Sequence, residues 1–167
     1  AAQGIVAGIN AHLFLAGKEP MVLRRDQAYI GVLIDDLINK GVDEPYRMFT
    51  SRAEFRILLR QDNADFRLTA LSHDLGLADE QRYAAMMRKQ ESVDLLQDLC
   101  ERTKMRPDVV NPLLESLGST PLSEGKHLED LVSRPEISLD EILKIVPRGT
   151  RAGYSMEVIT AVEVAIK

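Results

Sequence analysis

Residues 79–104 read DEQRYAAMMRKQESVDLLQDLCERTK, and this stretch decides the fold class. Asp79 is a favourable N-cap residue, because its short side chain can accept a hydrogen bond from a free backbone amide of the first helical turn. The apolar side chains that follow recur at the three- and four-residue spacing of one helix face. They are Tyr83, Met86, Met87, Leu95, Leu96 and Leu99. The stretch therefore predicts a long helix that begins after Asp79 and ends near Lys104.

The segments on either side of this helix also have helical spacing. Asp26 is expected to cap one helix, and Ser51 with Glu54 forms the capping-box pattern that opens another. We therefore expect an all-α fold, an irregular bundle of short helices around the pair 26–40 and 51–61. The other expected helices are 1–15, 69–75, 107–118, 127–133, 139–146 and 155–167.

A polar linker at 119–125 that contains Pro121 is the best candidate for a boundary inside the chain. We expect a helical domain over 17–118 that carries the arginine-rich helix. The remaining segment, 119–167, is expected to form a smaller helical subdomain that is truncated at its C-terminus.

Composition limits the function classes. The chain has 167 residues, is 45% hydrophobic and 28% charged, and has a formal net charge of -5. It contains no uninterrupted apolar run of the roughly 18 residues that a membrane span needs, so no membrane association is expected. A net negative chain has no global attraction for nucleic acid, and any such contact must come from a local basic patch.

The best candidate for such a patch is the segment 45–67. It holds five arginines, Arg47, Arg52, Arg56, Arg60 and Arg67, against three acids, which gives a local charge of +2. In the expected helix 51–61, Arg52, Arg56 and Arg60 would share one face, free to meet an RNA backbone, because arginine binds phosphate through paired donors. The alternative is that these arginines pair with nearby acids, such as Asp35, Asp36, Asp62 and Asp65.

Other polar residues point less clearly to a site. Arg24 and Arg25 precede the helix 26–40, and Arg148 and Arg151 flank a glycine in a basic loop that could contact an anion. The adjacent acids Asp35 and Asp36 would project about 100° apart on a helix, so we expect caps or ion pairs and not a catalytic carboxylate pair.

No catalytic or metal-binding motif is apparent. The histidines His12, His73 and His127 lack a metal-ligand spacing, and Cys100 lies in the apolar stripe as a buried structural thiol would. The sequence has no Gly-x-Gly-x-x-Gly or Walker-type loop. We therefore expect no metal site and no catalytic residue in this chain.

Several strings resemble the C-terminal region of the MnmG (GidA) family. They are DQAYIGVLIDDL at 26–37, EPYRMFTSRAEFR at 44–56, DNADFRLT at 62–69 and the short signature Arg134-Pro135-Glu136. The opening residues 1–10 resemble the last helix of that family's flavin domain, so 1–16 is expected to be the end of a truncated FAD-binding domain.

The resemblance implies a function for a longer parent protein. With the partner GTPase MnmE, the family adds an aminomethyl or carboxymethylaminomethyl group to C5 of the wobble uridine of tRNA. It uses FAD, NADH and a folate one-carbon donor, and it acts in the cytoplasm as a homodimer. The helical region would contact tRNA and dock partners without turnover of its own, because the dinucleotide fingerprint and catalytic cysteines belong to the N-terminal portion.

The same resemblance suggests roles for individual residues. Gln3 and Gly4 become candidate neighbours of FAD, because the N-terminus of their helix would favour negative charge on a reduced flavin. The tRNA-contacting candidates are Arg47, Arg52, Arg56, Arg60, Arg24 and Arg25. The alternative is a purely structural helical scaffold for homodimer or partner contacts, with its arginines paired internally.

Overall fold

The structure is a computed structural model that describes residues 1–41, 43–146 and 153–167. Helices account for most of these residues, and the single sheet among them has two strands of two residues each. The expected all-α class is therefore confirmed. The chain divides into two compact units, Ala1–Leu75 and Gly76–Lys167. Residues 76–118 thus share a unit with the segment 119–167.

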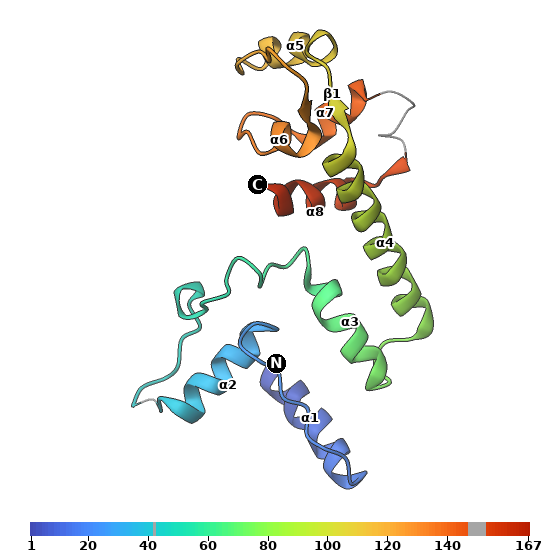
Figure 1. Ribbon diagram of the computed structural model, residues 1–167. Helices are drawn as coiled ribbons and strands as arrows, with labels where there is room; N and C mark the ends of the chain where they lie inside the picture. The colour runs from blue at the N-terminus through green and yellow to red at the C-terminus, as the bar shows by residue number, and fades with distance from the viewer. Residues whose placement is uncertain (42, 147–152) are drawn as a thin grey trace. The chain divides into compact units, whose positions relative to one another are not determined.

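The second unit is a helical bundle built on α4, the long helix anticipated from 79–104 (Figure 1). α4 packs against α6 and α8, and α7 packs against α5, α6 and α8. An ion pair between Lys89 Nζ and Glu157 Oε2, 3.4 Å long, also joins α4 to α8. The helices are α4 (Glu80–Arg102), α5 (Pro107–Ser116), α6 (Leu128–Val132), α7 (Leu139–Ile145) and α8 (Met156–Ile166).

Local capping residues set the ends of these helices. The carboxylate of Asp79 accepts a hydrogen bond from the Arg82 amide at 2.8 Å, which confirms the expected start of α4. Ser138 and Ser155 cap α7 and α8 in the same way. Gly118, with φ of 69°, lies just beyond α5, where a left-handed backbone ends a helix with least strain.

The core of the second unit is apolar and closely packed. α4 contributes Met86, Val93, Leu96 and Cys100, whereas Met87 and Leu95 from the expected stripe are exposed. The largest of its fully buried side chains are Leu96, Leu114, Leu128, Leu131, Ile137, Leu139, Ile142, Leu143, Ile159, Val110 and Val132. Hydrophobic burial in this unit is therefore the main stabilising contribution to the described fold.

The polar segment expected as a linker is held against the helices by hydrogen bonds. The Asn111 amide bonds to both backbone groups of Leu122, at 3.1 and 2.8 Å, and Ser119 Oγ donates to Glu136 at 2.7 Å. Strand β1 (Lys104–Met105) pairs antiparallel with β2 (Lys126–His127), which closes the segment. These bonds explain why 119–167 joins the same unit as α4 and α5.

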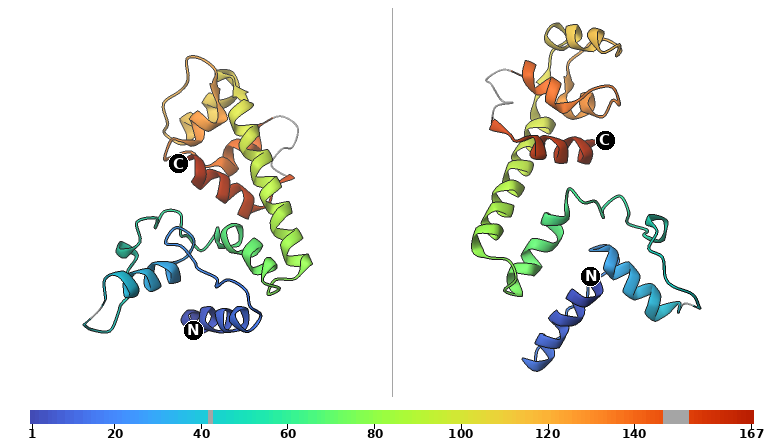
Figure 2. Two further views of the ribbon diagram at one scale, coloured as in Figure 1. Left: turned by 60° about the horizontal axis from the view of Figure 1, so that its bottom comes forward. Right: turned by 180° about the vertical axis from the view of Figure 1, so that it is seen from behind.

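The first unit is more open. It contains α1 (Ala2–Leu15), α2 (Tyr29–Asn39), the 3₁₀ turn η1 (Thr50–Arg52) and α3 (Ala64–Asp74). The views in Figure 2 show the chain between α2 and α3 as a long irregular path. Its buried apolar cluster is small and consists of Val32, Ala53 and Leu59, with Tyr29 and Met48 packed against it.

The expected helix 51–61 is wrong. In its place the chain forms η1 and then a turn in which the Leu58 and Leu59 amides both donate to Phe55 O. Ala53 and Leu59 are both buried against Val32. Six residues of α-helix would place them about 120° apart, so a regular helix would not direct both into this cluster. The capping box is also absent, since the Glu54 carboxylate contacts Arg25 instead of the Ser51 amide.

The start of α2 also differs from expectation. Asp26 forms an ion pair with Arg24, and α2 begins after Ala28 without a side-chain cap. Gly31 on α2 lies against the backbone of the preceding loop: an added Cβ would be 2.5 Å from Leu23 O and closer still to Arg24 O. The glycine is therefore required for the loop 23–28 to fold back along the helix.

Candidate nucleic-acid interface

Arg25 is the most highly bonded side chain of the first unit. It lies before α2, with its side chain 20% exposed. Nη1 donates to Asp35 and Asp36, each at 2.8 Å. Nη2 donates to Glu54 at 2.8 Å and to Arg52 O at 3.1 Å, and Nε also donates to Glu54. These acceptors match all five guanidinium N–H groups, so Arg25 has no donor left for an external phosphate.

The carboxylates around Arg25 are ion-paired, as was expected of Asp35 and Asp36, but their arginine partner is Arg25 and not an arginine of 45–67. Asp36 is 1% exposed and binds Lys40 Nζ at 2.9 Å, Tyr46 Oη at 2.7 Å and Arg25. Bonds from Lys40, Tyr46 and Arg25, in that order of effect, hold the pKa of Asp36 well below its usual range. Asp36 is therefore a charged structural group and not a proton donor.

Tyr46 connects this ionic cluster to a second arginine. Its hydroxyl donates to Asp36, while the Arg52 guanidinium carbon lies 4.7 Å from the centre of its ring. That distance is within the range of a cation–π interaction. Burial, followed by the hydrogen bond to Asp36, raises the pKa of Tyr46, so the phenol stays protonated and keeps donating. Arg52 is exposed, and its position is fixed from one side by the ring.

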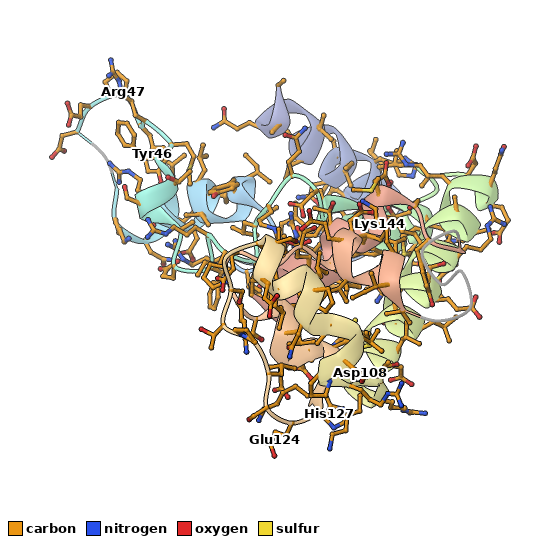
Figure 3. All side chains as sticks on the ribbon, turned by 90° about the horizontal axis from the view of Figure 1, so that it is seen from above. Tyr46, Arg47, Asp108, Glu124, His127 and Lys144 are labelled. Atoms are coloured by element: carbon orange, nitrogen blue, oxygen red, sulfur yellow. The ribbon has the colours of Figure 1, made fainter. Side chains whose placement is uncertain are left out.

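Three arginines of the 46–58 segment are exposed and have no carboxylate partner within the part of the chain that is described. They are Arg47, Arg52 and Arg56. Figure 3 shows Arg47 at the outer end of its loop, pointing away from the ribbon, while Tyr46 beside it points inward. Instead of a row on one helix face, the cations therefore extend from an irregular loop. We call this loop, residues 46–58, the arginine loop.

The other arginines of the candidate set are bonded within the chain. Arg60 pairs with Asp62 at 2.9 Å, and Arg24 pairs with Asp26 at 2.9 Å. Hydrogen bonds to these acids raise the pKa of both guanidinium groups. Arg67 donates to Asn63 Oδ1 and to the carbonyl oxygens of Arg60 and Gln27. Structural pairing thus accounts for these three residues, although two of the pairs are surface pairs of small energetic value.

Sequence reasoning missed the central role of Arg25 and the contribution of Tyr46. Asp35 and Asp36 were considered as partners of the arginines at 47–67, but they bind Arg25, which comes earlier in the chain. No local pattern indicated this pairing, because Arg25 and Glu54 are 29 residues apart in the sequence.

The remaining polar candidates do not form a cluster. The described residues contain no group of three or more His, Cys, Asp or Glu side chains that could hold a metal ion. Cys100 is buried, as expected, and burial raises the pKa of its thiol to about 11, which makes it a poor nucleophile. Arg148 and Arg151, expected in an anion-contacting loop, lie outside the described residues.

The first turn of α1 carries the two residues expected near a flavin. Gln3 and Gly4 are exposed, the helix start has no side-chain cap, and the first turn has no acidic residue. An added Cβ at Gly4 or Gly8 would meet nothing within 4 Å. Small residues and free backbone amides leave this turn open to close approach by another group.

No helix among the described residues combines the length and the apolar character needed to cross a membrane.

Comparison with known proteins shows which family this chain is similar to. The family model described as "tRNA modifying enzyme MnmG/GidA C-terminal helical domain" matches residues 80–167. The tRNA uridine 5-carboxymethylaminomethyl modification enzyme MnmG of Porphyromonas gingivalis is 51% identical, over 100% of this chain and 28% of its own length. The enzyme of the same name from Listeria monocytogenes is 47% identical, over 100% of this chain and 26% of its own.

Solved structures agree with these matches. The crystal structure of Aquifex aeolicus GidA in form II has a TM-score of 0.78 and 36% identity, and covers 98% of this chain and 25% of that one. The form I crystal gives a TM-score of 0.75. The chain thus spans about a quarter of the length of the relatives it matches.

The all-α architecture, with the α4–α8 bundle at residues 80–167, defines the helical domain of a class of tRNA-modifying enzymes. Within that class, the chain belongs to the MnmG/GidA family, and it is the C-terminal helical part of such a protein.

Proposed function

We propose that this chain is the tRNA-contacting and docking part of an MnmG-type flavoenzyme. In the longer protein, the enzyme would act with the GTPase MnmE as a homodimer to add an aminomethyl or carboxymethylaminomethyl group to C5 of the wobble uridine. FAD and NADH would supply the redox chemistry from outside this chain, and the chain alone would not turn over substrate. The role would be a cytoplasmic one.

The observation that carries the proposal is the arginine loop. Arg47, Arg52 and Arg56 are exposed and lack carboxylate partners among the described residues, whereas Arg24, Arg25 and Arg60 are paired with acids. Unpaired guanidinium groups attract phosphate because they gain charge-assisted hydrogen bonds without first breaking an internal ion pair. Phe49 and Phe55, exposed by 53% and 44%, add ring surface on which unpaired bases can stack.

A tRNA titration at several salt concentrations tests this role. Replacing Arg47, Arg52 and Arg56 together by Gln should lower affinity and reduce the slope of log affinity against log salt by about 2–3, since each phosphate contact contributes roughly 0.7–0.9. Arg102→Gln is the matched control, because Arg102 is exposed in the other unit and already pairs with Asp98. An unchanged slope in the triple variant would contradict the proposal.

A structural scaffold is the second candidate, and exposed apolar side chains favour it. Ile57 and Leu58 in the arginine loop are 76% and 53% exposed, and Phe14 and Leu15 on α1 are exposed by more than 80%. Exposed apolar side chains that lie together commonly mark a site of contact with another protein. If the chain fails to bind tRNA even at low salt, and Ile57→Ser abolishes a self-association measured by sedimentation, the loop serves as a protein interface.

The proposed flavin contact concerns the longer protein. Gln3 and Gly4 would lie at the edge of the FAD site, where α1 amides favour negative charge. The open space at Gly4 supports this assignment, since a ring can approach the helix backbone there. In this role Gly4→Val would weaken flavin binding by the longer enzyme, whereas Ile5→Val would not.

A further inference from the structure

The arginine loop is attached to the ionic cluster through one residue in particular. Two contacts hold Arg52. Its guanidinium group lies over the ring of Tyr46, and its backbone carbonyl accepts a hydrogen bond from Arg25 Nη2 at 3.1 Å. By contrast, neither Arg47 nor Arg56 makes a side-chain hydrogen bond or ion pair within the described residues. Arg52 is thus the exposed arginine whose geometry the fold fixes.

The groups that hold Arg52 are themselves fixed by a buried charge. Asp36 Oδ2 accepts from the Tyr46 hydroxyl at 2.7 Å, and Asp36 Oδ1 accepts from Arg25 at 2.8 Å. Asp36 thereby orients both the ring beneath the Arg52 guanidinium and the guanidinium that binds the Arg52 carbonyl. A buried carboxylate with three donors loses much of its stabilisation if any donor moves, so the arrangement is stiff.

The cluster also changes the charge that a phosphate would meet beside Arg52. Glu54 is two residues away and its side chain is 57% exposed, so a free carboxylate there would repel an anion. Both oxygens of Glu54 are engaged by Arg25. Pairing offsets the Glu54 charge while the Arg52 donors face no carboxylate within the described chain.

We propose that Arg25, Asp36 and Tyr46 are positioning residues that preorganise Arg52 to bind a phosphate of RNA. This inference rests on the proposed tRNA contact and deepens it. Arg52 would be the dominant contact of the loop, because its side chain gives up less conformational freedom on binding than those of Arg47 and Arg56. Arg25 acts through Arg52 and Glu54 and does not itself contact the RNA.

A double-mutant cycle separates positioning from a general structural role. Affinity of the full 167-residue chain for a fluorescently labelled tRNA transcript is measured by anisotropy for Tyr46→Leu, Arg52→Gln and the double variant. Loss of the cation–π contact predicts that Tyr46→Leu lowers affinity about two- to fivefold. In the Arg52→Gln background, the same change should have no further effect. Tyr46→Phe keeps the ring but loses the bond to Asp36, and it should have a smaller, equally Arg52-dependent effect.

The outcomes distinguish the two proposals. If Tyr46→Leu is without effect, or lowers affinity equally with and without Arg52, the positioning role is overturned while tRNA contact can stand. If Arg52→Gln alone changes nothing but the triple arginine variant does, the positioning role is overturned too. If neither changes affinity, tRNA contact by the loop also fails. Circular dichroism checks that each variant is folded. If Tyr46→Leu unfolds the chain, Tyr46→Phe replaces it in the double-mutant cycle.

Discussion

At the scale of single residues, Asp36 shows how one buried charge organises its surroundings. Its carboxylate joins Lys40 on its own helix, Arg25 in the preceding loop and Tyr46 in the following one. Burying a charged carboxylate is strongly unfavourable unless its oxygens are bonded to cations or hydrogen-bond donors. Asp36 therefore ties α2 to both flanking loops through charge rather than through apolar area.

Replacing Asp36 by Asn should destabilise the first unit by about 1.5–3 kcal/mol, the usual contribution of hydrogen bonds to a charged group. The asparagine keeps the volume but cannot serve as an anionic acceptor for Arg25 and Lys40. Urea unfolding at neutral pH, followed by circular dichroism, measures the difference. Asp98→Asn is the control, because the Asp98 carboxylate is exposed and pairs only with Arg102 among the described groups; a similar loss there would contradict the assignment.

The same residue gives a pH dependence with a definite sign. The pKa of Asp36 is lowered in the folded chain, so its contribution to stability is complete above the unfolded pKa of about 3.9 and is lost as pH falls toward the folded value. The stability difference between wild type and Asp36→Asn should therefore shrink below about pH 4. A difference that stays constant down to pH 2 would show that Asp36 is not charged in the native state.

At the scale of elements, the glycines within helices differ in whether a side chain would fit at their positions. Gly31 on α2 lies against the carbonyl groups of Leu23 and Arg24, whereas Gly4 and Gly8 on α1 face open space. Alanine is favoured over glycine in a helix by about 1 kcal/mol when nothing else changes. The surroundings, and not the propensity, should therefore decide the effect of each substitution.

Gly31→Ala should lower the stability of the first unit, because the methyl group cannot fit against backbone atoms without moving the loop 23–28. Gly8→Ala is the matched control in an unobstructed helix and should be neutral or stabilising by about 0.5–1 kcal/mol. Thermal unfolding of both variants measures this. Equal effects of the two substitutions would mean that the loop does not pack on α2.

The segment 51–61 shows where helical spacing misleads. Its arginines recur every four residues, yet η1 and a turn form there. The spacing of charged residues carries little free energy, whereas burying Ala53 and Leu59 against Val32 and binding Glu54 to Arg25 both favour the irregular path. The start of α4 was predictable because its N-cap bond, from the Arg82 amide to Asp79, lies within the first turn of the helix.

At the scale of the whole chain, the two units differ in how they are stabilised. The second unit buries a continuous apolar core between α4 and the helices around it. The first unit has a cluster of three buried residues and an ionic network. Burial of apolar area is the larger and more cooperative contribution, so the second unit should open less often.

Hydrogen exchange on the full chain tests this difference. Amides of α4, α6, α7 and α8 should exchange slowest, and those of 43–63 at least roughly tenfold faster. The two sets should also respond differently to Asp36→Asn, which should speed exchange only within residues 1–75. Uniform protection across both units, or a response in α4, would contradict independent stabilisation.

The sequence by itself determined the all-α class, the length and start of α4, the helices near 139–146 and 155–167, the burial of Cys100 and the likeness to the MnmG/GidA family. Each of these depends on neighbours within a few residues or on quoted strings. Only the tertiary structure decided which arginines are paired. Arg25 meets a glutamate 29 residues further on, and that contact exists because α2 and the arginine loop are packed side by side around Val32.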